Sequence, residues 1–267
     1  MLKFFYLSFS NSLFSIFIIY LISVLSMDFI NNKIDFSSLL CSVKAKNLLH
    51  HLNELANDNE AGSIDSLQIE KNEHLKKWKN EWKKLSTVKA DSHAQQSLDE
   101  SERAATNWLI RLFNTLFTEQ RVILARSSGE PEYFPAKNNQ PARIEFANGF
   151  FASALHEISH WCVAGKRRRT LSDFGYWYAP DGRSAAQQQA FEHVEIKPQA
   201  LECLFTLACG GSFQVSQDNL FAEFDTSGST FATDVYLQVE QYIENPDTLP
   251  NDAKALLRTF LSVCTSQ

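Results

Sequence analysis

The chain has 267 residues, of which 44% are apolar, 12% aromatic and 21% charged, a composition too rich in core-forming residues for a disordered protein. The 25 basic and 31 acidic side chains give a net charge of −6, so no overall positive field favours a nucleic acid or an anionic membrane surface. The five cysteines are an odd number without a CxxC pair, which indicates a reducing compartment rather than a disulfide framework. We therefore expect a folded, cytoplasmic protein with no direct nucleic-acid partner.

The first 26 residues form an apolar segment, because no charged residue occurs from Phe4 to Met27. The segment is long enough to span a bilayer, and Lys3 ahead of it favours an N-terminus kept inside the cell. Met27 stands where the charges begin, and translation starting there would omit the segment. We expect that residues 1–26 are not part of the working protein. A membrane anchor through residues 4–26 is the alternative if they are translated and retained.

Residues 27–99 have the composition of a polar helical extension, and nothing in their sequence indicates what they do. Trp78 and Trp82 are four residues apart, so on a helix they would share one face, and lysines surround them. The pattern predicts a solvated helical extension with one apolar stripe packed on the main domain. A docking helix for an acidic partner is the alternative.

Residues 100–267 are expected to form one compact catalytic domain of the α+β class, mostly helical with a small sheet. Apolar residues recur at helical spacing from Ala104 to Phe117, which predicts a helix. Two short runs rich in β-branched or aromatic residues, Val122–Ala125 and Arg143–Phe146, predict strands joined by a long Gly, Pro and Asn-rich loop. A further helix is expected from about Ala185 to Cys209.

A central helix is expected at about residues 149–164, with Asn148 as its cap and Gly165 as its stop. It contains an HExxH motif whose two histidines are His156 and His160. At about 100° per residue they lie about 40° apart on one helix face. Two imidazoles one turn apart can bind the same divalent ion, so the motif predicts a metal site.

A third ligand is expected from the acidic stretch of the next helix, where Glu192, Glu195 and Glu202 share one polar stripe. Pro198 is expected to start a helix or to kink one just after Glu195, which would aim that carboxylate differently from its neighbours. We predict Glu195 as the third ligand, with Glu192 as the alternative and His193 after it.

Two reaction classes are compatible with these ligands. With zinc and an open coordination position, Glu157 would be the general base for a bound water in a metallopeptidase. With Fe(II), two histidines and one carboxylate leave positions open for dioxygen and substrate in an oxygenase. The spacing of the motif does not choose between them.

Three longer runs of residues indicate a family. The sequence closely resembles the bacterial elongation factor P hydroxylases over residues 146–166, 173–183 and 191–201, and the likeness extends from about Glu100 to the C-terminus. The resemblance implies a non-heme metal enzyme that is expected to use Fe(II) and dioxygen. Its substrate would be the lysine of elongation factor P that has already received a β-lysyl group.

The resemblance also implies roles for individual residues. His156 and His160 would be the histidine ligands, and the stretch holding Glu192 and Glu195 would supply the carboxylate. Because hydroxylation of an unactivated carbon needs a redox-active metal, zinc would not serve. Glu157 would then order a metal-bound water or orient a ligand histidine.

The substrate implied by the resemblance is a long cationic side chain. Aromatic residues that include Tyr176 and Tyr178 would line a slot for its methylene groups and face its ammonium groups, and plain packing of these rings is equally open. Asp173 and Asp181 are the predicted countercharges for the ammonium groups.

Overall fold

The computed structural model describes residues 34–59, 65–91, 95–147, 149–176, 182–219 and 221–265. Its helices are α2 (Ser42–Asn59), α3 (Asp65–Asp91), α4 (Gln95–Leu116), α5 (Phe151–Arg168), α6 (Ala185–Ala208), α7 (Phe231–Glu244) and α8 (Asn251–Val263). Its strands are β1 (Val122–Arg126), β2 (Glu132–Phe134) and β3 (Ala142–Phe146), and its short 3-10 helices are η1 (Thr118–Gln120), η2 (Ser172–Gly175) and η3 (Pro246–Thr248). The predicted α+β class, mostly helical with a small sheet, is confirmed.

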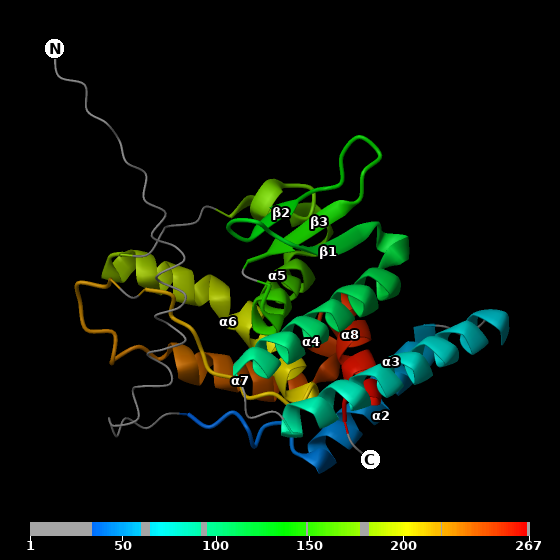
Figure 1. Cartoon of the computed structure of the whole chain (residues 1–267). Coiled ribbons are helices and arrows are strands. Elements are labelled where there is room, and N and C mark those ends of the chain that lie inside the picture. The colour runs from blue at the N-terminus through cyan, green and yellow to red at the C-terminus, as the bar shows by residue number, and fades with distance from the viewer. Residues whose placement is uncertain are drawn as a thin grey trace. The chain divides into compact units, whose positions relative to one another are not determined.

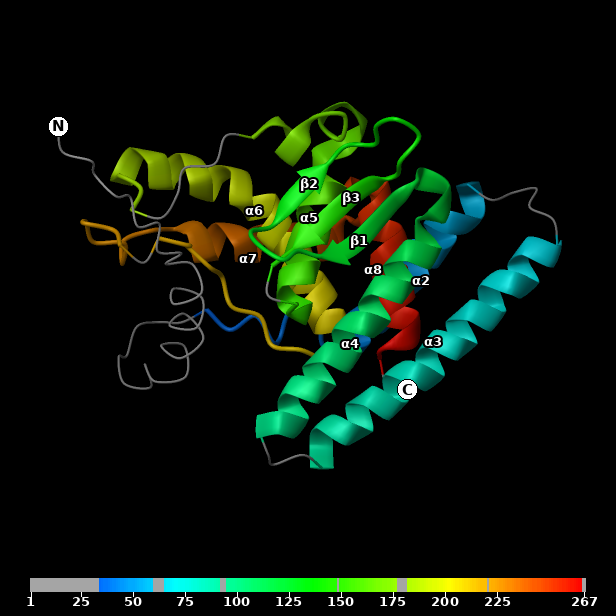
Figure 2. The ribbon, with the colours of Figure 1, turned by 45° about the horizontal axis from the view of Figure 1, so that its top comes forward.

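The sheet has the order β1-β3-β2, with β3 parallel to β1 and antiparallel to β2. Figures 1 and 2 show α4 and α5 beside the sheet, and these helices pack against β1 and β3 respectively. Strands β1 and β3 were predicted, whereas β2 lies in the segment expected to be a loop. It is only three residues long, and the burial of Tyr133 depends on stacking against Phe174, 4.1 Å between ring centres, which no local pattern reveals.

Helix α4 begins earlier than predicted. The expected helix at Ala104–Phe117 forms, but α4 starts at Gln95, so the boundary expected between residues 99 and 100 lies inside a helix. Helix α3 packs along it, with the rings of Trp82 and Trp108 4.5 Å apart. The Trp108 indole N–H donates to the carbonyl of Trp78 at 3.3 Å. The predicted shared face of Trp78 and Trp82 is therefore confirmed as an apolar contact with α4.

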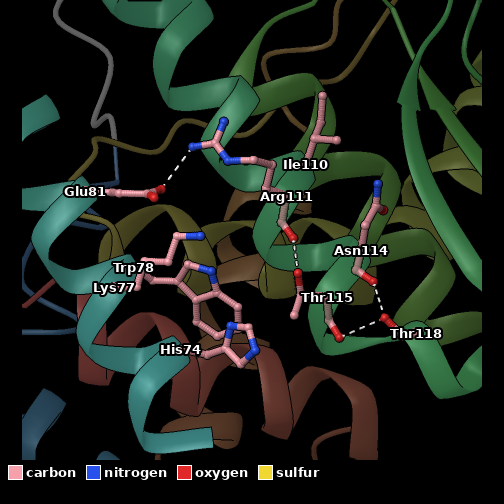
Figure 3. A pocket seen from close by; sticks show the side chains of 9 residues that line it. All are labelled: His74, Lys77, Trp78, Glu81, Ile110, Arg111, Asn114, Thr115 and Thr118. Atoms are coloured by element: carbon pink, nitrogen blue, oxygen red, sulfur yellow. Dashed lines mark hydrogen bonds and ion pairs between the residues drawn. The ribbon is translucent and has the colours of Figure 1, made fainter. Parts of the chain in front are cut away.

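The exposed side of this contact is an open groove of about 390 Å³ between α3 and α4 (Figure 3). A hydrogen-bonded ion pair between Arg111 and Glu81, at 2.9 Å, joins the two helices there. Its other lining residues are His74, Lys77, Trp78, Ile110, Asn114, Thr115 and Thr118. The groove is formed by different elements from those that carry the predicted metal ligands.

The core of the unit from Asp35 onward is built around α5, α6 and α8. Helix α6 packs against α5, α7 and α8, and the rings of Phe205 and Phe260 meet edge to face at 5.7 Å between α6 and α8. Within the described residues, none of the helices has both the length and the apolar character needed to cross a membrane. The apolar segment at residues 4–26 lies outside the described residues.

Candidate metal centre

Helix α5 presents two chemically different faces. Leu155, Ile158 and Cys162 are buried on one of them, while His156 and His160 are partly buried on the other. Gly165 leaves the helical conformation with φ 66° and ψ 173°, so the regular helix stops where glycine was predicted to stop it. The expected cap, Asn148, lies outside the described residues, and Phe150 occupies the N-cap position without a side-chain hydrogen bond.

Helix α6 carries the acidic stripe opposite this face. Its first turn is closed by Gln187, whose side-chain oxygen accepts the backbone N–H of Ser184 at 3.0 Å. Of the two alternatives predicted for Pro198, the start of a helix is wrong, since Pro198 lies buried inside α6. Proline has no backbone N–H, so the carbonyl of Val194, four residues earlier, lacks its helical hydrogen bond. Val194 is exposed, and water can donate to this carbonyl instead.

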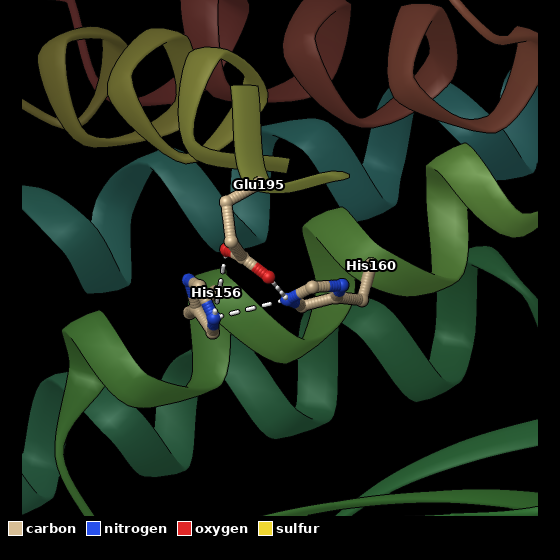
Figure 4. Close-up of side chains that lie close together, drawn as sticks. All are labelled: His156, His160 and Glu195. Carbon is tan, nitrogen blue, oxygen red and sulfur yellow. Dashed lines mark hydrogen bonds and ion pairs between the residues drawn. The ribbon is translucent and has the colours of Figure 1, made fainter. Parts of the chain in front are cut away.

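The structure brings His156, His160 and Glu195 together between α5 and α6 (Figure 4). The two Nε2 atoms are 3.0 Å apart, and Nε2 of His160 lies 3.2 Å from Oε1 of Glu195. Nε2 of His156 lies 3.8 Å from Oε2 of Glu195. Ligands about 2.1 Å from one ion lie about 3.0 to 3.4 Å apart at right-angled or tetrahedral geometry, so the two shorter separations fit a single ion. The 3.8 Å separation corresponds to a wider angle between its two ligand atoms.

A fourth residue fixes the orientation of His156. Nδ1 of His156 lies 2.8 Å from Oε2 of Glu202, and because a carboxylate accepts, Nδ1 must carry the proton. Nε2 then faces His160 and Glu195. This role was missed at the sequence level, where Glu202 was only one member of the acidic stripe. The sequence feature that could have indicated this role is the position of Glu202, two helical turns after Glu195 on the same face.

Opposite charges in the centre shift two pKa values strongly. Burial disfavours the imidazolium of His156, but the hydrogen bond to Glu202 and the charges of Glu202, Glu195 and Glu157 outweigh it and raise its pKa to about 10. Burial likewise opposes ionisation of Glu195, yet His160 and His156 lower its pKa to about 2. Without a metal, the centre therefore holds a protonated His156 beside an ionised Glu195 at neutral pH.

Comparison with known proteins identifies the family. Residues 112–266 match the elongation factor P hydroxylase family. The chain belongs to this family. A relative from Haemophilus influenzae, named elongation factor P lysine hydroxylase, is 45% identical over 163 residues, which are 60% of this chain and 89% of that protein. These matches make the chain an enzyme of the hydroxylase class and do not favour the metallopeptidase alternative.

In this member of the hydroxylase family, Glu157 follows His156 in the sequence but does not take part in the hydrogen bonds and ion pairs that join His156 and His160 to Glu195 and Glu202. Within the described part of the chain, Glu157 forms no hydrogen bond or ion pair. The residue that orients His156 is Glu202. Burial raises the pKa of Glu157, and the neighbouring imidazoles only partly oppose this rise.

The remaining candidates for the third ligand lie elsewhere on α6. Glu192 accepts hydrogen bonds from Nε2 of Gln188 at 3.1 Å and from the hydroxyl of Ser229 at 2.8 Å, and it is not among the clustered ligand atoms of the described chain. His193 is exposed. Among the described residues of this helix, Glu195 has its carboxylate clustered with the Nε2 atoms of both histidines, whereas Glu202 meets Nδ1 of His156.

The predicted substrate-contacting residues are only partly described. The ring of Tyr176 is 38% exposed and lies under the guanidinium of Arg168, 4.1 Å from the ring centre. Asp173 in η2 is exposed, and its Oδ1 accepts the backbone N–H of Tyr133 at 2.9 Å. Tyr178 and Asp181 lie outside the described residues.

Proposed function

We propose that this protein hydroxylates the β-lysylated lysine of elongation factor P at a mononuclear non-heme iron site, with dioxygen as the co-substrate. The observation that carries the proposal is the convergence of two imidazole nitrogens and one carboxylate in a chain of the elongation factor P hydroxylase family. A relative that is 45% identical bears the name of this activity. Because the substrate works with ribosomes, the reaction would take place in the cytoplasm.

The proposed ligands of the iron are His156, His160 and Glu195. Fe(II) held by two histidines and one carboxylate keeps open positions for dioxygen and substrate and supplies redox chemistry, which zinc does not. The donor types in this chain suit that ion, since imidazole and carboxylate both bind iron.

Glu202 and Glu195 prepare the proposed site before a metal binds. Glu202 keeps a proton on Nδ1 of His156, so Nε2 is the ring atom that binds the ion once the ion has displaced the proton that Nε2 carries in the metal-free imidazolium. Glu195 is 5% exposed and remains ionised, so its charge offsets that of a bound cation in a region shielded from water.

Glu157 is the proposed proton-handling group of the site. Its raised pKa follows from burial, and its carboxyl oxygens form no hydrogen bond or ion pair with the rest of the described chain. We assign it the role of holding a proton next to the reacting atoms. Tyr176, Asp173, Tyr178 and Asp181 stay predicted contacts of the cationic lysine side chain.

Intact-mass analysis of the substrate tests the proposal. The protein, reconstituted anaerobically with Fe(II) and then given oxygen, an excess of a chemical reductant and β-lysylated elongation factor P, should add one oxygen atom to the modified lysine. The reductant supplies the two electrons with which the second oxygen atom is released as water. Unmodified elongation factor P is the matched control for the required β-lysyl group. Absence of any mass increase in the β-lysylated substrate, with iron bound to the enzyme, would contradict the proposal.

A further inference from the structure

The structure connects the residues that precede the family-matched span to both ligand-bearing helices. That span begins at residue 112, so α2, α3 and most of α4 lie outside it. Nothing in the sequence of this preceding part assigns it a role. Its contacts with α5 and with the segment that follows α6 are specific, and they run close to His156 and Glu195.

The first contact holds the N-terminal turn of α5. The backbone N–H of Phe151 donates to Oε1 of Glu102 in α4 at 2.7 Å, which gives α5 the acceptor that its own N-cap residue does not supply. The ring of Phe151 also lies 5.9 Å from that of Trp82 in α3. Phe151 is five residues before His156 on the same helix. Glu102 and Trp82 therefore fix the start of the helix that carries both histidines.

The second contact holds the segment of residues 211–219. The ring of Phe36, ahead of α2, packs edge to face on Phe213 at 5.1 Å, and both rings are buried. Three residues further on, the backbone of Ser216 pairs with the side-chain amide of Gln199, with an N–H···O bond of 3.0 Å in one direction and 2.8 Å in the other. Phe36 therefore buttresses a segment whose backbone fixes Gln199.

Gln199 links this segment to the proposed ligand Glu195. Its Nε2 lies 3.5 Å from Oε2 of Glu195, one turn earlier on α6, and only 2% of Gln199 is exposed. The same segment is also held near the start of α6 by Gln188, whose Nε2 donates to the carbonyl of Gln217 at 2.9 Å. The path from Phe36 to Glu195 is thus made of packed and hydrogen-bonded groups.

We propose that Phe36, Trp82 and Glu102, which precede the family-matched span, are positioning residues of the metal centre rather than parts of an independent appendage. Glu102 and Trp82 set the position of α5, and Phe36 sets the segment that orients Gln199 and, through it, Glu195. This inference rests on the proposed metal centre and concerns positioning residues only, since none of the three touches a ligand atom in the described contacts.

Co(II) binding to variants of the full chain separates positioning from general stability. The test variants are Phe36→Ala and Glu102→Ala, with Glu102→Gln as the conservative variant that keeps a side-chain oxygen acceptor. The control for Phe36→Ala is Leu52→Ala, because Leu52 is buried like Phe36 and lies in the same part of the chain, on α2, which packs against α8 and η3. The readouts are the Co(II) dissociation constant, the visible Co(II) spectrum and the thermal midpoint without metal, all on protein folded at the assay temperature.

The positioning role predicts that Phe36→Ala and Glu102→Ala each weaken Co(II) binding about 10-fold, the lower end of the range for groups that support metal ligands. Their Co(II) spectra should change as well. Leu52→Ala should lower the thermal midpoint yet keep the wild-type affinity and spectrum, and Glu102→Gln should bind Co(II) more tightly than Glu102→Ala.

Wild-type Co(II) affinity in both Phe36→Ala and Glu102→Ala would overturn the inference. The inference would also be overturned if the Co(II) affinity decreased in proportion to the thermal midpoint in every variant, including Leu52→Ala. Failure of the wild-type chain to bind Co(II) would overturn the proposed metal centre itself, and that outcome is distinct from the first two.

Discussion

Two pairs of side chains with the same helical spacing serve different purposes in this molecule. Trp78 and Trp82 on α3 are 7% and 8% exposed and pack on α4, where Trp108 supplies an aromatic surface. His156 and His160 on α5 turn their Nε2 atoms toward each other and toward a carboxylate of α6. A spacing of four residues places two side chains on one face, but the facing helix decides whether that face becomes core or a metal centre.

The two contacts should also differ in how they tolerate change. An apolar contact depends on volume and area, so a smaller ring retains much of it. A metal centre depends on particular donor atoms at particular positions, so the loss of one donor has a disproportionate effect. Substitutions at matched positions in the two regions measure this difference.

The largest effect is expected from His156→Ala or His160→Ala. Either change removes one of two imidazole donors, so bound metal and hydroxylation should both be lost. Trp78→Phe is the matched control in the aromatic pair and should retain metal. Metal content by atomic emission spectrometry checks the prediction, and full metal retention in both histidine variants would contradict the assigned centre.

The next largest effect on bound metal distinguishes two carboxylates on α6. Glu195→Ala should lose more metal than Glu192→Ala, because Glu195 lies 3.2 Å from Nε2 of His160 whereas Glu192 is bonded to Gln188 and Ser229. Metal titration of the two purified variants gives the order. The reverse order would move the carboxylate ligand three residues upstream.

A smaller loss of metal affinity is expected when Glu202 is changed to Gln. The amide no longer supplies the charge that holds the Nδ1 proton of His156, and outer partners of this kind typically change metal affinity about 10- to 100-fold. Competition between Co(II) and a chromophoric chelator measures the change. An unaltered affinity would show that Glu202 does not tune His156.

Proton release on metal binding tests the raised pKa of His156 beside Glu202. The pKa of His156 is raised to about 10, so the metal-free imidazole is protonated at pH 8, and a metal must displace that proton to bind Nε2. We expect release of about one proton at pH 8 and a decline to none as the pH rises above about 10. Titration calorimetry of Co(II) in two buffers of different ionisation enthalpy measures it. Release near zero at pH 8 would rule out the charged imidazole.

The smallest effect is expected at the groove between α3 and α4. Arg111→Ala removes an ion pair with Glu81 whose arginine side chain is 58% exposed, and such pairs contribute about 0 to 1 kcal/mol. Chemical denaturation should therefore show a change in unfolding free energy of less than about 1 kcal/mol, with metal affinity unchanged. A loss of metal affinity would mean that this contact, too, positions the centre.

Local sequence patterns predicted the elements that carry the site. The helix around the HExxH motif, the acidic helix that follows, and strands β1 and β3 all have periodicity or composition that fixes their type. The two faces of α5 were predictable for the same reason, since helical geometry alone separates His156 from Leu155 and Ile158.

The interactions that complete the site were not predictable from local patterns. The hydrogen bond between His156 and Glu202 spans 46 residues, and the pairing of Gln199 with Ser216 depends on how the chain turns after α6. Strand β2 and the early start of α4 likewise depend on tertiary contacts of residues with weak local preferences. Packing between distant segments supplies this information, and it is absent from any short window of sequence.

Anomalous diffraction from crystals loaded with Fe(II) under anaerobic conditions tests the central claim most directly. One iron peak per chain is expected, within bonding distance of Nε2 of His156, Nε2 of His160 and the carboxylate of Glu195. A peak bound by other residues, or no peak between α5 and α6 in fully loaded protein, would contradict it.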